Sequence, residues 1–146
     1  MSAGNKVRAR KVDLSTDYDT IALWWKKHGS YAPMRDHLPP IGIMVEKDRE
    51  PICVGFLYNT DSKICVIEFI ICDPEAEKEL RDIALNHLIK TLRDIALELE
   101  YTAIYNSTGI KKFIGRLKEQ GFKEADKNQT HMFYFAYDTI EDQENE

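Results

Sequence analysis

The chain has 146 residues and a net charge of −5, but the excess charge is concentrated at one end. Residues 138–146 hold five acidic residues and no basic one, so the rest of the chain has the other 20 acids and all 20 bases and is neutral. A neutral body argues against a dedicated nucleic-acid-binding protein, and no apolar run reaches the ~18 residues that a membrane span needs.

The length predicts one domain over residues 1–137, followed by an acidic tail at residues 138–146 that is expected to be solvated. A tail that contacts a partner is the alternative. The basic N-terminus is followed by no hydrophobic stretch, so we expect no signal peptide. The three cysteines and four histidines show no ligand spacing, so we expect no disulfide framework and no metal site, in a cytoplasmic protein.

The first half of the chain is expected to form a strand, a helix and then three more strands. The predicted elements are a strand at Lys6–Leu14, a helix at Thr16–His28 with Ser15 as N-cap, a turn or short helix at Tyr31–His37, and strands at Ile41–Glu46, Ile52–Tyr58 and Ile64–Cys72. The last strand is apolar on both faces, which is typical of a central strand covered on both sides. Trp24 and Trp25 are adjacent on the helix and point about 100° apart, so at most one of them is expected in the core.

The second half is expected to alternate helices and strands. The predicted elements are a helix at Glu77–Glu98, a strand at Tyr101–Tyr105, a helix capped by Ser107 or Thr108 and ended by Gly121, and a closing pair of strands at Phe122–Ala125 and His131–Tyr137. The long helix has one continuous apolar face at spacings of three and four residues. The order β-α-(α)-β-β-β-α-β-α-β-β predicts an α/β fold with a mixed central sheet flanked by helices.

This order, with Cys72-Asp73-Pro74 before the long helix and Leu117–Phe122 at the end of the second, resembles the GNAT superfamily of N-acetyltransferases. The resemblance covers Lys6 to Tyr137 and is nearest to small, divergent members, including those encoded by bacteriophages. It implies acetyl-CoA as the cofactor and an amine as the acceptor. It also implies that backbone amides in the last strand before the long helix pair with pantetheine; the residues are Ile70, Ile71 and Cys72.

The turn before the long helix departs from the family pattern. The family motif Gln/Arg-x-x-Gly-x-Gly/Ala falls on Glu77, Leu80 and Asp82, so the turn lacks glycine, and residues 75–82 hold four carboxylates. One interpretation is that these acids complement the helix dipole. The other is that side chains replace the glycine amides in contacting phosphate; the candidates are Lys78, Arg81 and Lys112, with Asn106 as a further cofactor-binding residue.

Glu68 is the one charged residue between Ile64 and Cys72. Burial would disfavour its charged form, which is the tuning that a general base for an amine needs. By resemblance, the same strand carries a catalytic glutamate in many GNAT enzymes. The alternative is a structural carboxylate that reaches a sheet edge or pairs with a base such as Arg35. Leu117 stands where many members have a tyrosine that acts as general acid.

Aromatic residues are expected to line the acceptor site, with Trp24 and Tyr58 as the substrate-binding candidates. Two functions remain open. The first is an acetyl-CoA-dependent N-acyltransferase with Glu68 as base. The second is a catalytically inactive, GNAT-derived protein that binds a protein partner through the Trp24 and Trp25 helix or through the acidic tail.

Overall fold

The structure, a computed structural model, describes residues 6–136, which divide into two compact units between Thr108 and Gly109. The first unit contains the described strands and two α-helices, and the second contains one α-helix. Residues 137–146, which include the expected acidic tail, lie outside the described residues. The expected domain boundary after residue 137 therefore stays a prediction.

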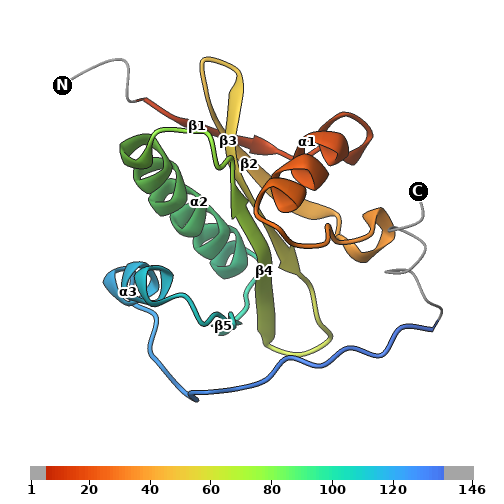
Figure 1. Cartoon of the computed structure of the whole chain (residues 1–146). Helices are drawn as coiled ribbons and strands as arrows, with labels where there is room; N and C mark the ends of the chain where they lie inside the picture. Colours follow the sequence, from red (N-terminus) through yellow and green to blue (C-terminus); the bar gives the residue numbers. More distant parts are fainter. Residues whose placement is uncertain (1–5, 137–146) are drawn as a thin grey trace. The chain divides into compact units, whose positions relative to one another are not determined.

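The first unit is built on a five-stranded mixed sheet in the order β1-β2-β3-β4-β5 (Figure 1). The strands are β1 (Arg8–Lys11), β2 (Ile41–Lys47), β3 (Glu50–Tyr58), β4 (Ile64–Cys72) and β5 (Ala103–Tyr105). Neighbours from β1 to β4 are antiparallel, and β5 runs parallel to β4. The mixed sheet is confirmed and β4 has the expected bounds, but the middle strand is β3, because β5 alone lies beyond β4.

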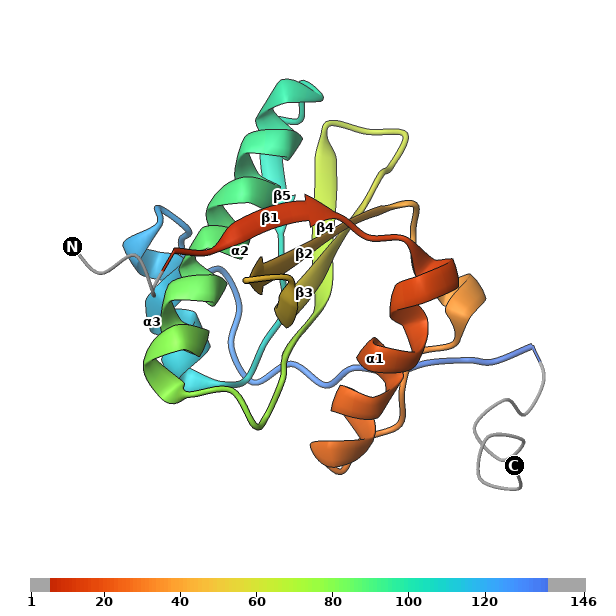
Figure 2. The ribbon, with the colours of Figure 1, turned by 90° about the horizontal axis from the view of Figure 1, so that it is seen from above.

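Two helices cover opposite faces of this sheet, which can be followed in both views (Figures 1 and 2). The helical elements of the chain are α1 (Leu14–Lys27), the 3-10 helix η2 (Arg35–His37), α2 (Lys78–Glu98) and α3 (Lys111–Glu119). α1 lies on one face, and α2, which is the crossover from β4 to β5, lies on the other. The N-cap of α1 is Asp13 rather than Ser15: the Asp13 backbone is extended, and its carboxylate accepts the N–H of Ser15 at 3.1 Å.

Alternate residues of β3 separate the two faces of the sheet. Val54 and Phe56 belong to the buried cluster that contains residues of α1. Between them, a Cβ placed on Gly55 would lie 3.1 Å from a methyl of Leu92 and 3.2 Å from one of Leu88, both in α2. α1 and the predicted apolar face of α2 therefore pack on opposite sides of the sheet.

A buried ion network joins β1, α1 and β2. The Arg10 guanidinium donates to both carboxylate oxygens of Asp17, at 2.8 and 2.9 Å, and to Glu46 at 3.0 Å. Asp17 is 6% exposed and Glu46 is 9% exposed. The hydrogen bond from Arg10 lowers the pKa of the Asp17 carboxyl, and the same bond raises the pKa of Arg10. The network thus fixes three elements through one guanidinium.

Gly42 of β2 is expected to be intolerant of any side chain. An added Cβ would lie 2.6 Å from Cε2 of Phe56, whose side chain is fully buried, and 3.1 Å from Cβ of Val12. We expect Gly42→Ala to destabilise the protein by about 1–3 kcal/mol through overpacking, measured by urea unfolding. The control is Gly115→Ala in α3, where an added Cβ has no heavy atom within 4 Å and should not destabilise. Equal stability of wild type and Gly42→Ala would contradict this packing.

The second unit is described by itself. α3 has Ile110 as its N-cap, without a side-chain hydrogen bond, so neither Ser107 nor Thr108 caps it. It ends as predicted, with Gly121 at φ +96° and the N–H of Phe122 bonded to the carbonyl of Leu117 at 3.0 Å.

The predicted closing strands are absent from residues 122–136, and Tyr137 lies outside the described residues. In the segment from His131 on, the side chains of Met132, Phe133 and Tyr134 are 88%, 72% and 94% exposed. A hairpin that buries no apolar face is marginal in water, so β propensity alone does not form it.

Candidate functional site

β4 and β5 pair over a short stretch and then separate. The parallel register joins Ile64–Val66 to Ala103–Tyr105 and stops there, while β4 continues to Cys72. The side-chain amide of Asn106 follows β5 and donates to the carbonyl of Ile67 at 2.8 Å, at the point where the next backbone pair would form. No strand of residues 6–108 pairs with the last part of β4 on this side, so β4 and β5 diverge beyond Val66.

A bulge interrupts β4 beyond this point. The register pairs Val54 with Ile71 and Phe56 with Glu68, so Gly55 faces two residues, one of which is Phe69. Phe69 has φ +55°, a left-handed conformation that costs a non-glycine residue about 1–3 kcal/mol. Strain of this kind is held by the surrounding packing and is common at ligand sites.

The bulge places an aromatic cluster, formed by Trp25, Tyr58 and Phe69, on the face covered by α1. The centroid of the Phe69 ring lies 6.2 Å from that of Trp25, in an edge-on arrangement, and 6.3 Å from that of Tyr58. All three residues are half-buried, so part of each remains accessible. The Tyr58 hydroxyl donates to the carbonyl of His37 at 2.6 Å, which fixes the orientation of its ring.

Glu68 lies beside this cluster. Its register partner Phe56 belongs to the buried cluster on the α1 face, and cross-strand partners share a face. Burial, and then the charge of Glu68, raise the pKa of Tyr58 to about 12. The Tyr58 phenol therefore stays protonated and uncharged near neutral pH. Glu68 is the acidic side chain close enough to act on it.

The adjacent tryptophans have different environments, as the helix geometry predicts. Trp24 is 4% exposed and packs in the core, so it is not available to contact a substrate. Trp25 contacts Phe69 instead, and its Nε1 is buried without a hydrogen-bond acceptor among the described residues. A buried donor left unpaired costs about 1–3 kcal/mol. Trp25 replaces Trp24 as the candidate; helical direction alone did not say which of the two faces β4.

The turn between β4 and α2 is held by the end of α1. The Lys27 ammonium pairs with the Glu75 carboxylate, and a ring nitrogen of His28 lies 3.1 Å from the carbonyl of Cys72. The hydrogen bond that Lys27 donates to Glu75 lowers the pKa of Glu75 and raises that of Lys27. One of the four acids in this region is thus neutralised by α1, a contact that the sequence did not reveal. The sequence feature that could have indicated this contact is the pair of basic residues in the last turn of α1, Lys26 and Lys27.

The predicted phosphate contacts are spread over both units. Lys78 is the first residue of α2 and is exposed, and Arg81 is half-buried one turn later with its Nε unpaired among the described residues. Glu77, the N-cap of α2, makes no side-chain cap hydrogen bond. Lys112 is exposed on α3 in the second unit. Within their own units, Lys78 and Lys112 are therefore accessible, and Arg81 has a guanidinium nitrogen without a hydrogen-bond partner among the described residues.

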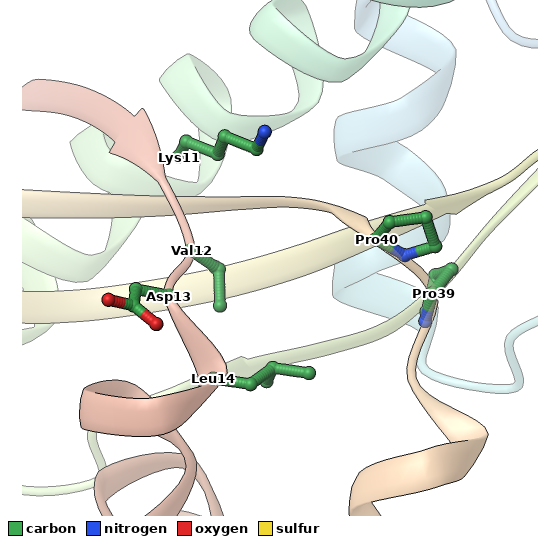
Figure 3. Close-up of a pocket in the computed structure, with 6 residues that line it drawn as sticks. All are labelled: Lys11, Val12, Asp13, Leu14, Pro39 and Pro40. Carbon is green, nitrogen blue, oxygen red and sulfur yellow. The ribbon is translucent and has the colours of Figure 1, made fainter.

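A pocket of about 400 Å³ lies at the junction of β1 and α1 (Figure 3). It is lined by Lys11, Val12, Asp13, Leu14, Pro39 and Pro40. Leu14 points toward Pro39, whereas the Asp13 carboxylate points away and caps α1 (Figure 3). This pocket is at the opposite end of α1 from Trp25 and is distinct from the divergence of β4 and β5.

Among residues 6–136 there is no helix long and apolar enough to cross a membrane. Within the same range, no three His, Cys, Asp or Glu side chains lie together in a way that would hold a metal ion.

The sequence matches no protein-family model and no curated protein. The structure is similar to solved acetyltransferases. Glucosamine-6-phosphate N-acetyltransferase from Arabidopsis thaliana aligns with a TM-score of 0.66 and 8% identity over 88% of this chain and 99% of that chain. An acetyltransferase from Trypanosoma brucei aligns with a TM-score of 0.64 and 13% identity over 88% of this chain and 100% of that chain.

N-acetylglutamate synthase from Neisseria gonorrhoeae, complexed with coenzyme A and L-arginine, aligns with a TM-score of 0.65 and 16% identity over 96% of this chain and 31% of that chain. Identities this low carry information about the fold. The chain has the fold of the GNAT-type N-acetyltransferases.

Proposed function

We propose that the protein is an N-acyltransferase that transfers an acetyl group from acetyl-CoA to an amine. The observation that carries this proposal is the divergence of β4 from β5, where Asn106 bonds Ile67, next to a strained bulge at Phe69 that directly follows Glu68. The names of the similar structures, and the coenzyme A in one of them, support it.

The residues around β4 fit coenzyme A in one half of the site and depart from the family pattern in the other. The printed pairing of β4 with β5 ends at Val66, and beyond it Ile70, Ile71 and Cys72 would hold the pantetheine arm on the side of β4 that faces β5. The turn before α2 offers no glycine and carries acidic side chains. Phosphate contact is therefore assigned to the side chains of Lys78 and Arg81, with the uncapped N-terminus of α2 adding a partial positive charge. The expected role of Lys112, in the second unit, stays a prediction from the sequence.

Acetyl-CoA supplies a thioester carbonyl carbon that an amine nitrogen can attack. Glu68 takes one proton from the acceptor ammonium, which leaves a nucleophilic amine. Backbone N–H groups on the side of β4 that faces β5 would donate to the carbonyl oxygen, where negative charge develops. A nitrogen–carbon bond forms as the carbon–sulfur bond breaks, and the second amine proton neutralises the departing sulfur. The products are an amide, a thiol and one proton that Glu68 returns to solvent.

The acidic turn favours a second candidate, a GNAT-derived binding protein without catalysis. A protein that no longer binds pyrophosphate does not need glycines before α2, and Leu117 replaces the tyrosine that many family members use as general acid. The two candidates differ in whether acetyl-CoA binds at all.

Calorimetric titration with acetyl-CoA tests the cofactor assignment. We expect weak binding by the wild type. The double variant Lys78→Gln and Arg81→Gln should bind at least about tenfold more weakly and with a flatter salt dependence, because two charged phosphate contacts are lost. The matched control neutralises Lys90 and Lys123, two exposed lysines elsewhere.

Two results would count against the assignment in different ways. No heat of binding with the wild type would favour the second candidate. Tight binding that the double variant and the control share would retain the cofactor but remove these two side chains from its site.

A further inference from the structure

Two of the three cysteines lie directly opposite each other on neighbouring strands. The antiparallel register of β3 and β4 pairs Cys53 with Cys72, and the adjacent pair, Val54 with Ile71, continues this register. Cross-strand partners project from the same face of a sheet, so the two thiol side chains leave the backbone side by side. Both residues occur as thiols in the structure.

The backbone hydrogen bonds show which kind of cross-strand pair the two cysteines form. The N–H of Asp73 donates to the carbonyl of Ile52 at 2.8 Å, immediately beside the cysteines. Hydrogen-bonded and non-hydrogen-bonded pairs alternate along an antiparallel ladder, so Cys53 and Cys72 form a non-hydrogen-bonded pair. In such a pair the Cα atoms are about 4.5 Å apart and the side chains are closest. A disulfide joins Cα atoms about 4.4–6.8 Å apart, so this pair can be bridged while the two strands stay together.

The two thiols differ in access to solvent. Cys53 is fully buried, whereas Cys72 is the last residue of β4 and is half-buried. A dissolved oxidant therefore reaches Cys72 first, and Cys53 is the thiol placed to react next. The third cysteine, Cys65, is fully buried, pairs in register with Ile104 of β5, and lies roughly 20 Å from Cys72 along β4. It cannot join Cys72 in the folded sheet.

We propose that Cys53 and Cys72 form a redox-reactive dithiol, which a small disulfide such as glutathione disulfide oxidises to a cross-strand disulfide. The Cys72 thiolate attacks one sulfur of the oxidant, whose S–S bond breaks, and the first half leaves as a thiol with the proton that Cys72 lost. Cys53 then attacks the Cys72 sulfur, and the second half leaves as a thiol with the proton of Cys53. Two protein thiols lose two electrons and two protons, and the oxidant gains them.

The position of the bridge gives it a consequence for the fold. Cys72 directly precedes the turn from β4 into α2, so a disulfide would tie the end of β4 covalently to β3 at the start of this turn. Reduction by a dithiol would release it. This inference does not rest on the proposed acetyl transfer, and its test uses no acetyl-CoA.

The first test exposes the whole folded chain to glutathione redox buffers of increasing oxidised fraction. After acid quenching and unfolding, the remaining thiols are counted and the mass is measured. We expect the wild type to lose two of its three thiols and two hydrogens, without a retained glutathione. Proteolysis after Lys, Arg and Glu should then link the Cys53 peptide to the Cys72 peptide, because cleavage after Glu68 separates Cys72 from Cys65.

Three variants test the order of the two steps. Cys72→Ser removes the accessible thiol and should lower the rate of thiol loss at least about tenfold. Cys53→Ala removes the second thiol and should retain one glutathione on Cys72. The matched control is Cys65→Ala, which should close the same bridge as the wild type. Circular dichroism checks that each variant is folded, and if Cys53→Ala does not fold, the peptide map and Cys72→Ser decide the outcome.

Three results would overturn the proposal. The first is a wild type that keeps all three thiols in the most oxidising buffer. The second is a wild type that retains glutathione on Cys72 without forming a bridge. The third is a bridge that includes Cys65, or one that forms only in urea, since either would show that disulfide formation requires unfolding rather than the register of β3 and β4.

Discussion

Glu68→Gln is expected to lower acetyl-transfer turnover by about 10²–10⁴-fold while leaving acetyl-CoA affinity nearly unchanged. Glutamine keeps the shape of the side chain on β4 and cannot take a proton from the acceptor ammonium. The pH profile of kcat/KM should also lose its acidic limb, because that limb reports protonation of the base. The measurements are steady-state kinetics over a pH series and calorimetric titration with acetyl-CoA.

The matched control for this prediction is Glu79→Gln, which removes an exposed carboxylate from the first turn of α2. It should leave turnover and its pH profile unchanged. Full activity of the Glu68 variant would move that carboxylate to a structural role beside Tyr58, and the binding-protein candidate would then gain weight if acetyl-CoA also fails to bind.

Arg10→Met is expected to destabilise the first unit by about 3–5 kcal/mol, measured by urea unfolding at neutral pH. The methionine fills similar space but leaves Asp17 and Glu46, at 6% and 9% exposure, without their shared cation. The control is Arg8→Met on the same strand, where the side chain is exposed and the effect should stay within about 0.5 kcal/mol. Similar unfolding of both variants would show that the network contributes little.

The same network predicts the acid dependence of stability. The pKa of Asp17 is lowered in the folded protein, chiefly by the hydrogen bond from Arg10. A carboxylate of this kind stabilises the fold at pH values above its unfolded pKa of about 3.9, and the contribution is lost as pH falls through the lower folded value. The wild type should therefore lose stability below about pH 4, and its advantage over Arg10→Met should shrink there.

Local pattern in the sequence determined the elements that are long or have clear chemistry at their ends. The apolar run Ile64–Cys72 has the bounds of β4, because nine consecutive residues with strand propensity have no competing turn signal. The apolar spacing of α2 gave its position to within one residue, and Gly121 ended α3 because glycine adopts a left-handed conformation at little cost. The identity of Glu68 as the charge on β4 followed from the same run.

The tertiary structure decided which side chains meet, since such contacts join residues far apart in the chain. Trp25 rather than Trp24 reaches the bulge because α1 packs with one particular face on the sheet. The left-handed turn at Phe69 follows from the two-against-one register with β3, which no local pattern in β4 announces. Lys27 and Glu75 pair across 48 residues.

The predicted closing strands are a second case in which local sequence pattern was not sufficient to predict the structure. The residues from His131 onward have the composition of a strand, yet strand formation needs a partner and a buried face, and the exposed Phe133 and Tyr134 have no such face. Propensity along the chain is therefore sufficient for elements that bury their own apolar face in the core, such as β4 and α2. It is insufficient for the contacts of the candidate site, which depend on register and packing between elements.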